Sequence, residues 1–207
     1  MERNMPSVLI ATSNKGKFAE IQKILGELDG IKLLSLSDVA RGSVNVVENG
    51  ATFKDNALIK AKAYGDASGL IAIADDSGLE VDFLNGAPGI NSARYAGIGA
   101  EDSMLVQKLL NNMKDAEDKE RGARFKCVAC LYDPKTKENI FTEGECEGKI
   151  AFEPRGKNGF GYDPIFIVDG SNGKTMAELT PDIKNQMSHR AKAFMALKKE
   201  LTKSIIN

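Results

Sequence analysis

The sequence has almost no net charge, few side chains that could form disulfides or bind zinc, and no long apolar run. Its 28 basic and 29 acidic residues nearly cancel, so the chain as a whole does not favour nucleic acid or a membrane surface. No run approaches the ~20 apolar residues of a membrane span, and residues 1–6 lack the apolar segment of a signal peptide. We therefore expect a soluble, cytoplasmic protein with no nucleic-acid or membrane partner.

The single histidine and the three cysteines exclude several kinds of site. Cys127 and Cys130 form a C-x-x-C pattern, but they stand in a strand-like segment, where residues three apart point to opposite faces. We therefore expect core cysteines and no zinc site. Cys146 stands alone, so no disulfide framework is expected. Without a second histidine or a G-x-S-x-G pattern, a Ser-His-Asp hydrolase is not expected either.

Helical and strand patterns alternate at first and give way to hairpins later, which predicts an α/β fold on a mixed sheet. The length fits a single domain, 1–207, in one body or two lobes. The opening βαβ unit consists of a strand at 8–11, a helix from about Phe18 through Leu28 that Asp29-Gly30 ends, and a strand at 31–36. The later elements are a short strand at 44–47, a helix at 52–64, a strand at 70–74, a helix around 105–113, a solvated charged connector at 114–121, a hairpin of 124–132 and 139–147, a strand at 165–168, and a final helix from about His189 with Ser188 as its N-cap.

The most informative segment is an apolar run, Leu70 to Ala74, that gives way to Asp75, Asp76, Ser77 and Gly78. We expect a buried parallel strand to end at this point, and ligand sites in open α/β sheets lie beyond such ends. Two adjacent acids would repel each other unless a cation lay between them, and Glu48, after Val46-Val47, offers a third carboxylate. Oxygen ligands of this kind suit Mg²⁺, which proteins bind through one or two carboxylates and substrate phosphates. The alternative is a solvated turn.

Three further segments are candidates for binding a phosphate or a base. The loop from Thr12 to Lys17 precedes a helix whose first amides would attract an anion, although it is not a P-loop. The glycine-rich stretch 156–164 offers Phe160 as a stacking plane, unless its aromatic residues pack into the core. Lys60 and His189 each have an ordinary alternative, a solvated lysine and a structural histidine.

Taken together, these segments resemble the inosine triphosphate pyrophosphatase family. The matching segments occur in the family's order and are Thr12–Lys17, Glu48 with Thr52-Phe53, Ala74–Leu79, Gly86–Gly89, Ser92–Tyr95, Gly159–Pro164 and Ser188–Arg190. The resemblance implies a long mixed β-sheet with flanking helices, two lobes around a central nucleotide-binding cleft, and a homodimer. It also implies Mg²⁺-dependent hydrolysis of non-standard purine nucleoside triphosphates (ITP, dITP, XTP) to the monophosphate and pyrophosphate.

The resemblance also implies a role for individual residues. Asp76 would accept the proton of the attacking water and bind the metal, with Glu48 and Asp75 as further metal ligands. The residues expected to hold phosphates are Thr12, Ser13, Asn14, Lys15, Gly16, Lys17, Lys60 and Ser77. Those expected at the base end are Phe160, Gly161, Tyr162, Asp163, Lys184, His189 and Arg190. Two other interpretations stay open: a pyrophosphatase for other modified nucleotides, and a non-catalytic nucleotide-sensing module.

Overall fold

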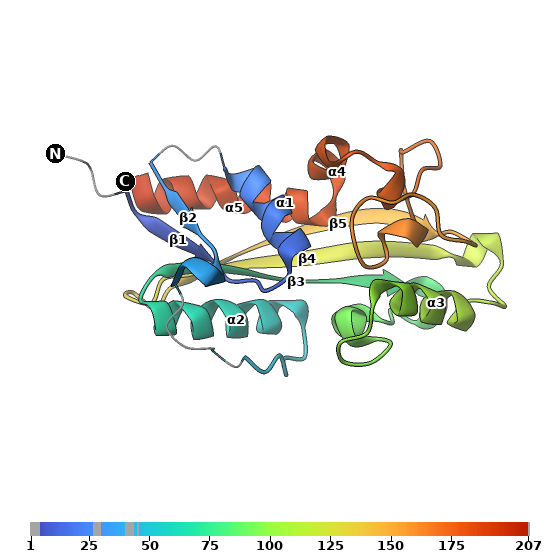
Figure 1. Ribbon diagram of the computed structural model, residues 1–207, viewed down its shortest axis with the longest axis horizontal. Coiled ribbons are helices and arrows are strands. Elements are labelled where there is room, and N and C mark those ends of the chain that lie inside the picture. Colours follow the sequence, from blue (N-terminus) through green and yellow to red (C-terminus); the bar gives the residue numbers. More distant parts are fainter. Residues whose placement is uncertain (1–4, 27–29, 40–43, 45, 207) are drawn as a thin grey trace. The chain divides into compact units, whose positions relative to one another are not determined.

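Our computed structural model describes residues 5–26, 30–39, 44 and 46–206 (Figure 1). The strands are β1 (Ser7–Ile10), β2 (Lys32–Leu34), β3 (Ile71–Val81), β4 (Gly122–Tyr132), β5 (Asn139–Ile150) and β6 (Phe166–Val168). The α-helices are α1 (Lys15–Leu25), α2 (Phe53–Ser68), α3 (Asp102–Asn112), α4 (Pro181–Met187) and α5 (His189–Ile206). Short 3₁₀ helices are η1 (Leu36–Val39), η2 (Asp82–Leu84), η3 (Gly89–Arg94), η4 (Asp118–Glu120), η5 (Asp163–Ile165) and η6 (Met176–Glu178).

The described strands form one sheet in the order β2-β1-β3-β4-β5-β6. β1 pairs in parallel with both β2 and β3, as expected of strands joined through helices, whereas β5 and β6 pair antiparallel. The α/β class and the mixed sheet expected from the sequence are therefore confirmed.

The chain divides into two compact units, each with its own core. Unit 1 comprises residues 1–76, 127–144 and 190–207, and unit 2 comprises residues 77–126 and 145–189. The three long strands β3, β4 and β5 contribute residues to both.

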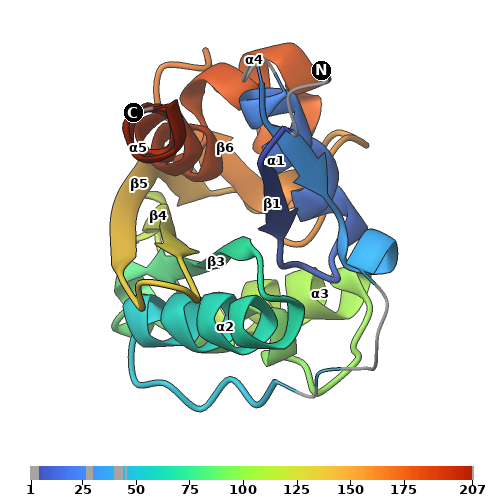
Figure 2. The same ribbon diagram turned by 90° about the vertical axis from the view of Figure 1, so that its left-hand side faces the viewer.

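Unit 1 has helices on both faces of its strands. α1 and α5 lie on one side of β1 and β3, and α2 lies on the other (Figures 1 and 2). Ile21 of α1 and Phe194 of α5 pack with Ile73 in a single core cluster. On the opposite face, a Cβ at Gly65 of α2 would lie 2.8 Å from the ring of Tyr132, so a glycine is needed for the close approach of helix and sheet. This arrangement gives β3 two separate chemical environments, one on each face.

The core of unit 2 contains residues from β3, α3, β4 and β6, including Leu79, Leu109, Phe125 and Phe166. The predicted solvated connector at 114–121 is exposed over most of its length, but Ala116 and Arg121 are buried. The Arg121 side chain is 2% exposed and donates to four backbone carbonyls, those of Met113, Ala116, Ile150 and Ala151. A guanidinium has five N–H donors, so it can serve several carbonyls at once, and here it binds the connector to the end of β5.

The prediction that a strand ends at Ala74 is wrong. The strand does not end at Ala74 but continues through Asp75, Asp76 and Gly78 to Val81. The pairing with β1 does end near Ile73, whose carbonyl accepts the amide of Ala11. β3 lies between β1 and β4 in the sheet, and this tertiary environment overrides the turn preference of Asp, Ser and Gly. The acidic pair therefore lies inside a strand, just beyond the carboxyl end of β1.

Several element boundaries also differ from those predicted. α1 begins at Lys15 and ends at Leu25, earlier than expected at both ends, and Leu28 and Asp29 lie outside the described residues. β2 stops at Leu34, and Leu36 begins η1. The described residues at 44, 46 and 47 form no strand. The hairpin of β4 and β5 is confirmed, whereas α4 was not predicted.

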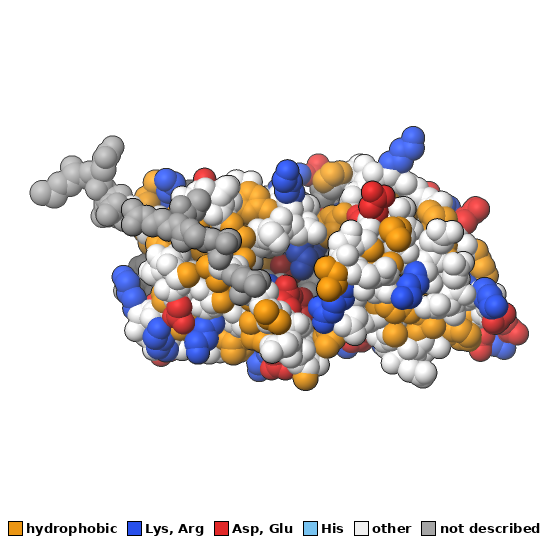
Figure 3. Space-filling model, turned by 60° about the horizontal axis from the view of Figure 1, so that its bottom comes forward, with side chains coloured by type: hydrophobic (Ala, Val, Ile, Leu, Met, Phe, Trp, Pro, Cys, Tyr) orange, Lys and Arg blue, Asp and Glu red, His pale blue; other side chains and the backbone are white. Residues whose placement is uncertain are grey.

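Among the described residues, no helix is both long and apolar enough to cross a membrane. On the face shown in Figure 3, basic, acidic and apolar side chains are interspersed among the described residues, and no continuous basic stripe is visible. The three cysteines are buried and form no disulfide, as expected, and burial raises the pKa of the Cys130 thiol to about 12.

Candidate active site

Asp75 and Asp76 point to opposite faces of β3, because successive side chains alternate along a strand. Asp76 contacts side chains of α2, and Asp75 contacts side chains of α1 and α5. Both carboxylates are buried, with 2% of Asp75 and 7% of Asp76 exposed. The two acids therefore make their direct contacts with different basic side chains, Asp76 with Lys60 and Asp75 with Lys17 and Arg190.

On the α2 face, Lys60 lies between two carboxylates. Its Nζ donates to Oε2 of Glu48 at 2.7 Å and to Oδ1 of Asp76 at 3.1 Å. The other oxygen of Asp76, Oδ2, accepts from Nδ2 of Asn56 at 3.2 Å. Glu48, from the segment before α2, and Asp76, from β3, thus lie close together, as predicted, with the Lys60 ammonium between them.

Burial raises the pKa of Asp76 above the usual value of an aspartate, although Lys60 and Lys17 oppose the shift. For Lys60, burial disfavours the charged form, but the nearby carboxylates of Asp76, Asp75 and Glu48 outweigh it and raise its pKa. Lys60 therefore carries its charge in this site. A carboxylate whose pKa is raised is a stronger base than an exposed one, which suits a group that must accept a proton from water.

On the opposite face, Oδ2 of Asp75 accepts from Nζ of Lys17 at 3.0 Å and lies 3.5 Å from Nε of Arg190. Arg190 also pairs with Glu20 of α1 at 2.6 Å, and its side chain is 2% exposed. Although burial opposes its charge, Asp75 and Glu20 raise the pKa of Arg190 further. The Asp75 carboxylate therefore pairs with Lys17 and Arg190 on one face of β3, whereas Glu48 and Asp76 meet at Lys60 on the other face.

The loop from Thr12 to Lys17 leads from β1 into α1. Oδ1 of Asn14 caps the helix by accepting the amide of Lys17 at 3.0 Å, and Oγ1 of Thr12 accepts the amide of Asn14. The first turn of α1 contains no acidic residue, and Ser13, Asn14 and Lys15 are exposed. The positive end of the helix dipole therefore faces solvent with lysines beside it, an arrangement that suits an anion.

In unit 2, the glycine-rich segment forms a compact polar cluster around Asp163. Oδ2 of Asp163 accepts from Nζ of Lys184 at 2.6 Å and from the amide of Phe160 at 2.9 Å. The Lys184 ammonium lies 4.8 Å from the centre of the half-buried Phe160 ring. Gly159 has φ +79°, and a Cβ there would lie 1.9 Å from Asp163 Oδ2, so only glycine fits.

Other predicted base-end residues have clear structural contacts. Tyr162 is buried and donates its hydroxyl to the Ser92 carbonyl at 2.9 Å, so this aromatic residue does pack into the core. The ring of His189 stacks on Phe125 with centroids 4.7 Å apart. The amide of Gly161 donates to Asp102 at 2.7 Å. These contacts fix the shape of the segment, and a role in binding a base stays a prediction, as does that of Ser77 on β3.

The donor set around Asp76 fits Mg²⁺. Oxygens of Glu48 and Asp76 lie within 2.7 and 3.1 Å of the same ammonium nitrogen, so this position already stabilises a positive charge. Mg²⁺ prefers such oxygens and takes its remaining ligands from water and phosphates. Within the described ranges, no group of three His, Cys, Asp or Glu side chains is arranged to hold a metal. A site with two carboxylates therefore takes its remaining oxygens from water, or from phosphates when a nucleotide is bound.

Sequence reasoning missed two side chains of these clusters. Asn56, which is completely buried on α2, bonds to Asp76, and Glu20 on α1 pairs with Arg190. Both occur at helical positions with no recognisable motif. The spacing of Asn56 and Lys60, four residues apart on one helix face, was the available signal.

Comparison with known proteins gives matches over almost the whole chain. The model of the Ham1 family matches residues 8–200. The dITP/XTP pyrophosphatase of Bacillus subtilis (strain 168) is 47% identical over 197 residues, which cover 95% of this chain and 98% of that protein. A HAM1 protein from Coxiella burnetii has the same fold with a TM-score of 0.85 and 44% identity, covering 97% of this chain and 100% of the other. The Ham1 protein of Staphylococcus aureus gives a TM-score of 0.82 with 40% identity, covering 95% of this chain and 98% of the other.

Proposed function

The chain belongs to the Ham1 family, and from this membership we propose that it hydrolyses non-standard purine nucleoside triphosphates. The substrates would be dITP, XTP and ITP, and the products the nucleoside monophosphate and pyrophosphate. The observation that carries the proposal is the convergence of Glu48 and Asp76 on one positive charge at Lys60. The relative from Bacillus subtilis, a dITP/XTP pyrophosphatase, supports the substrate class.

Residues of unit 1 would bind the triphosphate. Exposed amides at the start of α1, with Lys15 and Lys17, neutralise phosphate oxygens. Lys60 adds a further positive charge beside Asp76. These groups stabilise the negative charge that develops as the bond between the α- and β-phosphates breaks.

Asp76 would accept the proton of the water that attacks the α-phosphorus. Burial raises its pKa, and its Oδ2 is held by Asn56, so the carboxylate is both more basic and oriented. Glu48 and Asp76 would hold Mg²⁺ together with phosphate oxygens. The ion, when bound, supplies charge neutralisation at the triphosphate. Because Asp75 pairs with Lys17 and Arg190 on the other face, we assign it to positioning these two cations rather than to binding metal.

Base recognition would involve Phe160, Asp163 and Lys184. Phe160 offers a partly exposed ring for stacking, and Lys184 offers a buried ammonium. Inosine and xanthine carry a carbonyl at C6, which accepts a hydrogen bond, whereas adenine carries an amino donor there. A donor left buried against adenine would cost about 1–3 kcal/mol, so a few such contacts would discriminate against ATP.

A substrate panel tests the proposed function. Pyrophosphate release is measured for dITP, XTP, ITP, dGTP, ATP and dUTP with Mg²⁺, and the monophosphate is identified chromatographically. We expect dITP, XTP and ITP to be hydrolysed at least about thirtyfold better than ATP in kcat/KM, from two such contacts of at least about 1 kcal/mol each at 1.4 kcal/mol per decade. A preference for dUTP or another modified pyrimidine would replace the substrate assignment. Tight binding of dITP without turnover would favour a nucleotide-sensing module.

The family resemblance further supports a homodimer in the cytoplasm. Light scattering on the purified protein would decide the first point, with a mass near twice 22.3 kDa expected and a mass near 22.3 kDa contradicting it. Fractionation of cells that produce the protein would decide the second.

A further inference from the structure

Asn56 connects two parts of the proposed active site. It lies in the first turn of α2, and its side chain is completely buried. At one end, Nδ2 donates to Oδ2 of Asp76 at 3.2 Å, and at the other, Oδ1 accepts the backbone amide of Gly50 at 2.8 Å. One side chain thus joins Asp76 on β3 to the segment that carries Glu48.

The contacts leave one orientation for the Asn56 amide. The Gly50 N–H can only donate, so it must face the amide oxygen, and an ionised Asp76 can only accept, so it must face the NH₂ group. A flipped amide would place donor against donor at one end and acceptor against acceptor at the other. The orientation of Asp76 Oδ2 is therefore coupled to the position of Gly50.

Asn56 is itself held rigidly. Thr52 and Asp55 form a reciprocal capping box at the start of α2, so the first turn of the helix is well fixed. Gly50 comes so close that a Cβ there would lie 2.7 Å from Oδ1 of Asn56 and 2.6 Å from Cβ of Asp55. The close approach of the Glu48 segment to Asn56 therefore depends on glycine at position 50.

We propose that Asn56 is a positioning residue that sets the geometry between Glu48 and Asp76. By holding Oδ2, it leaves Oδ1 of Asp76 directed at the position that Lys60 Nζ shares with Glu48. Asn56 touches neither the ammonium position nor the proposed phosphate loop in any contact described above, so it acts through the two carboxylates. The inference rests on the proposed function, because it takes Glu48 and Asp76 as the metal-binding pair.

Mutating a residue that hydrogen-bonds to a metal-ligating carboxylate typically lowers metal affinity or activity by about 10–100-fold, and we expect an effect of this size for Asn56. Asn56→Leu keeps the branching of the side chain, although the leucine is larger, and removes both hydrogen bonds. We expect it to weaken Mn²⁺ binding to the nucleotide-free protein by about tenfold or more and to lower kcat for dITP by a similar factor. KM for dITP should change by less than about threefold, because the loop from Thr12 to Lys17 is untouched.

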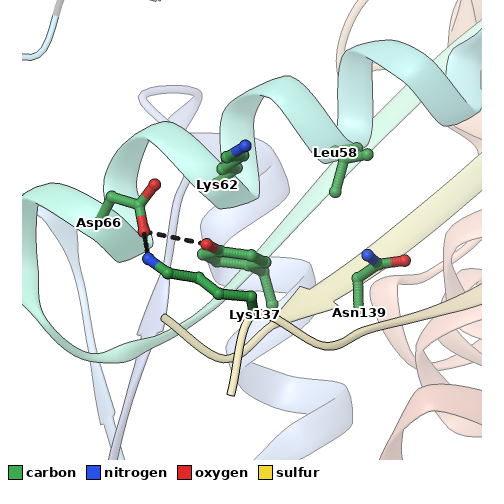
Figure 4. Close-up of a pocket in the computed structure, with 6 residues that line it drawn as sticks. Leu58, Lys62, Asp66, Lys137 and Asn139 are labelled. Carbon is green, nitrogen blue, oxygen red and sulfur yellow. Dashed lines mark hydrogen bonds and ion pairs between the residues drawn. The ribbon is translucent and has the colours of Figure 1, made fainter. Parts of the chain in front are cut away.

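Tyr132→Phe is the matched control. Tyr132 is buried, and its hydroxyl donates to Oδ1 of Asp66 near the other end of α2 at 2.9 Å. Lys137 donates to the same Asp66 oxygen (Figure 4), and these residues line a hollow of about 440 Å³ in unit 1. The variant removes one partly buried hydrogen bond to the same helix but none to Asp76. It should lower Tm and leave Mn²⁺ affinity and kcat within about twofold of the wild type. Tyr132 shares no contact with Glu48 or Asp76, so the loss of its hydrogen bond lowers stability without changing the geometry of the site.

Mn²⁺ affinity by calorimetry, kcat, KM and Tm are measured for the wild type, Asn56→Leu and Tyr132→Phe. Losses of both affinity and kcat in Asn56→Leu alone support the proposal. If Asn56→Leu loses only Tm, as Tyr132→Phe does, Asn56 is merely structural and the proposal is overturned. Should Asn56→Leu not fold, Asn56→Asp, which keeps the shape and the bond from Gly50, must still lose kcat. If the wild type released no pyrophosphate, the proposed function would fail, while the Mn²⁺ comparison would still decide the role of Asn56.

Discussion

Substituting the two adjacent aspartates should give opposite results, because they lie on opposite faces of β3. The Asp75 side chain is 1% exposed, and in Asp75→Asn both Lys17 and Arg190 lose its buried negative charge. Removing one partner of a buried ion pair costs about 3–5 kcal/mol. Arg190 keeps Glu20 at 2.6 Å, so we expect the lower end, a loss of about 3 kcal/mol in the free energy of unfolding.

In Asp76→Asn, the stability should change little and the turnover should collapse. The amide avoids the burial cost that raises the pKa of Asp76, while Lys60 keeps its bond to Glu48, so these effects offset each other to within about 1 kcal/mol. An amide cannot accept the proton of water, and the loss of a general base lowers kcat by about 10²–10⁴.

Urea unfolding of both variants and of the wild type gives the free energies, and pyrophosphate release from dITP gives kcat. The reasoning is refuted if folded Asp76→Asn turns over at near the wild-type rate. It also fails if folded Asp75→Asn loses as much kcat as Asp76→Asn with no loss of stability, because the two acids would then serve the same step.

Three other predictions follow from the structure. Activity should require Mg²⁺ and vanish in EDTA, since the carboxylates of Glu48 and Asp76 are the proposed ligands; full activity after exhaustive chelation would exclude this. Arg190→Ala should lower the free energy of unfolding, because Asp75 and Glu20 lose a buried partner, and, if Arg190 recognises the C6 carbonyl as the resemblance implies, the folded variant should lose about ten- to a hundredfold in kcat/KM for ITP and less of any slow activity on ATP. Equal losses of kcat/KM for ITP and ATP would instead show that Arg190 has a structural role and does not recognise the base. Arg121→Met should lower the free energy of unfolding by about 3 kcal/mol or more, because four buried carbonyls lose their donor; an unchanged urea midpoint would contradict the contacts.

Periodicity predicted the fold class well because most elements have an apolar face that must be buried. β1, α2 and the hairpin of β4 and β5 each show such a pattern, and all occur where expected. The end of β3 was mispredicted because local turn preference is weaker than hydrogen bonding inside a sheet. α4, only seven residues long, has too few turns to show a helical period.

The candidate site was predictable only where charged or polar residues directly follow an apolar segment in the sequence. The acidic pair and the lysine-rich loop were recognisable because charged residues next to apolar strands are unusual. Which face each aspartate takes depends on strand continuity, and so the separation of Asp75 from Asp76 could not be read from the sequence. The contacts of Asn56 with Asp76 and of Glu20 with Arg190 join residues 20 and 170 positions apart, which only the fold brings together.

The central claim is that water attacks the α-phosphorus of the triphosphate with Asp76 as the proton acceptor. Hydrolysis of dITP in ¹⁸O-labelled water, followed by mass spectrometry of both products, tests it most directly. The account predicts one labelled oxygen in the deoxyinosine monophosphate and none in the pyrophosphate, with Asp76→Asn forming neither product at an appreciable rate. Label in the pyrophosphate, or release of labelled orthophosphate, would contradict it.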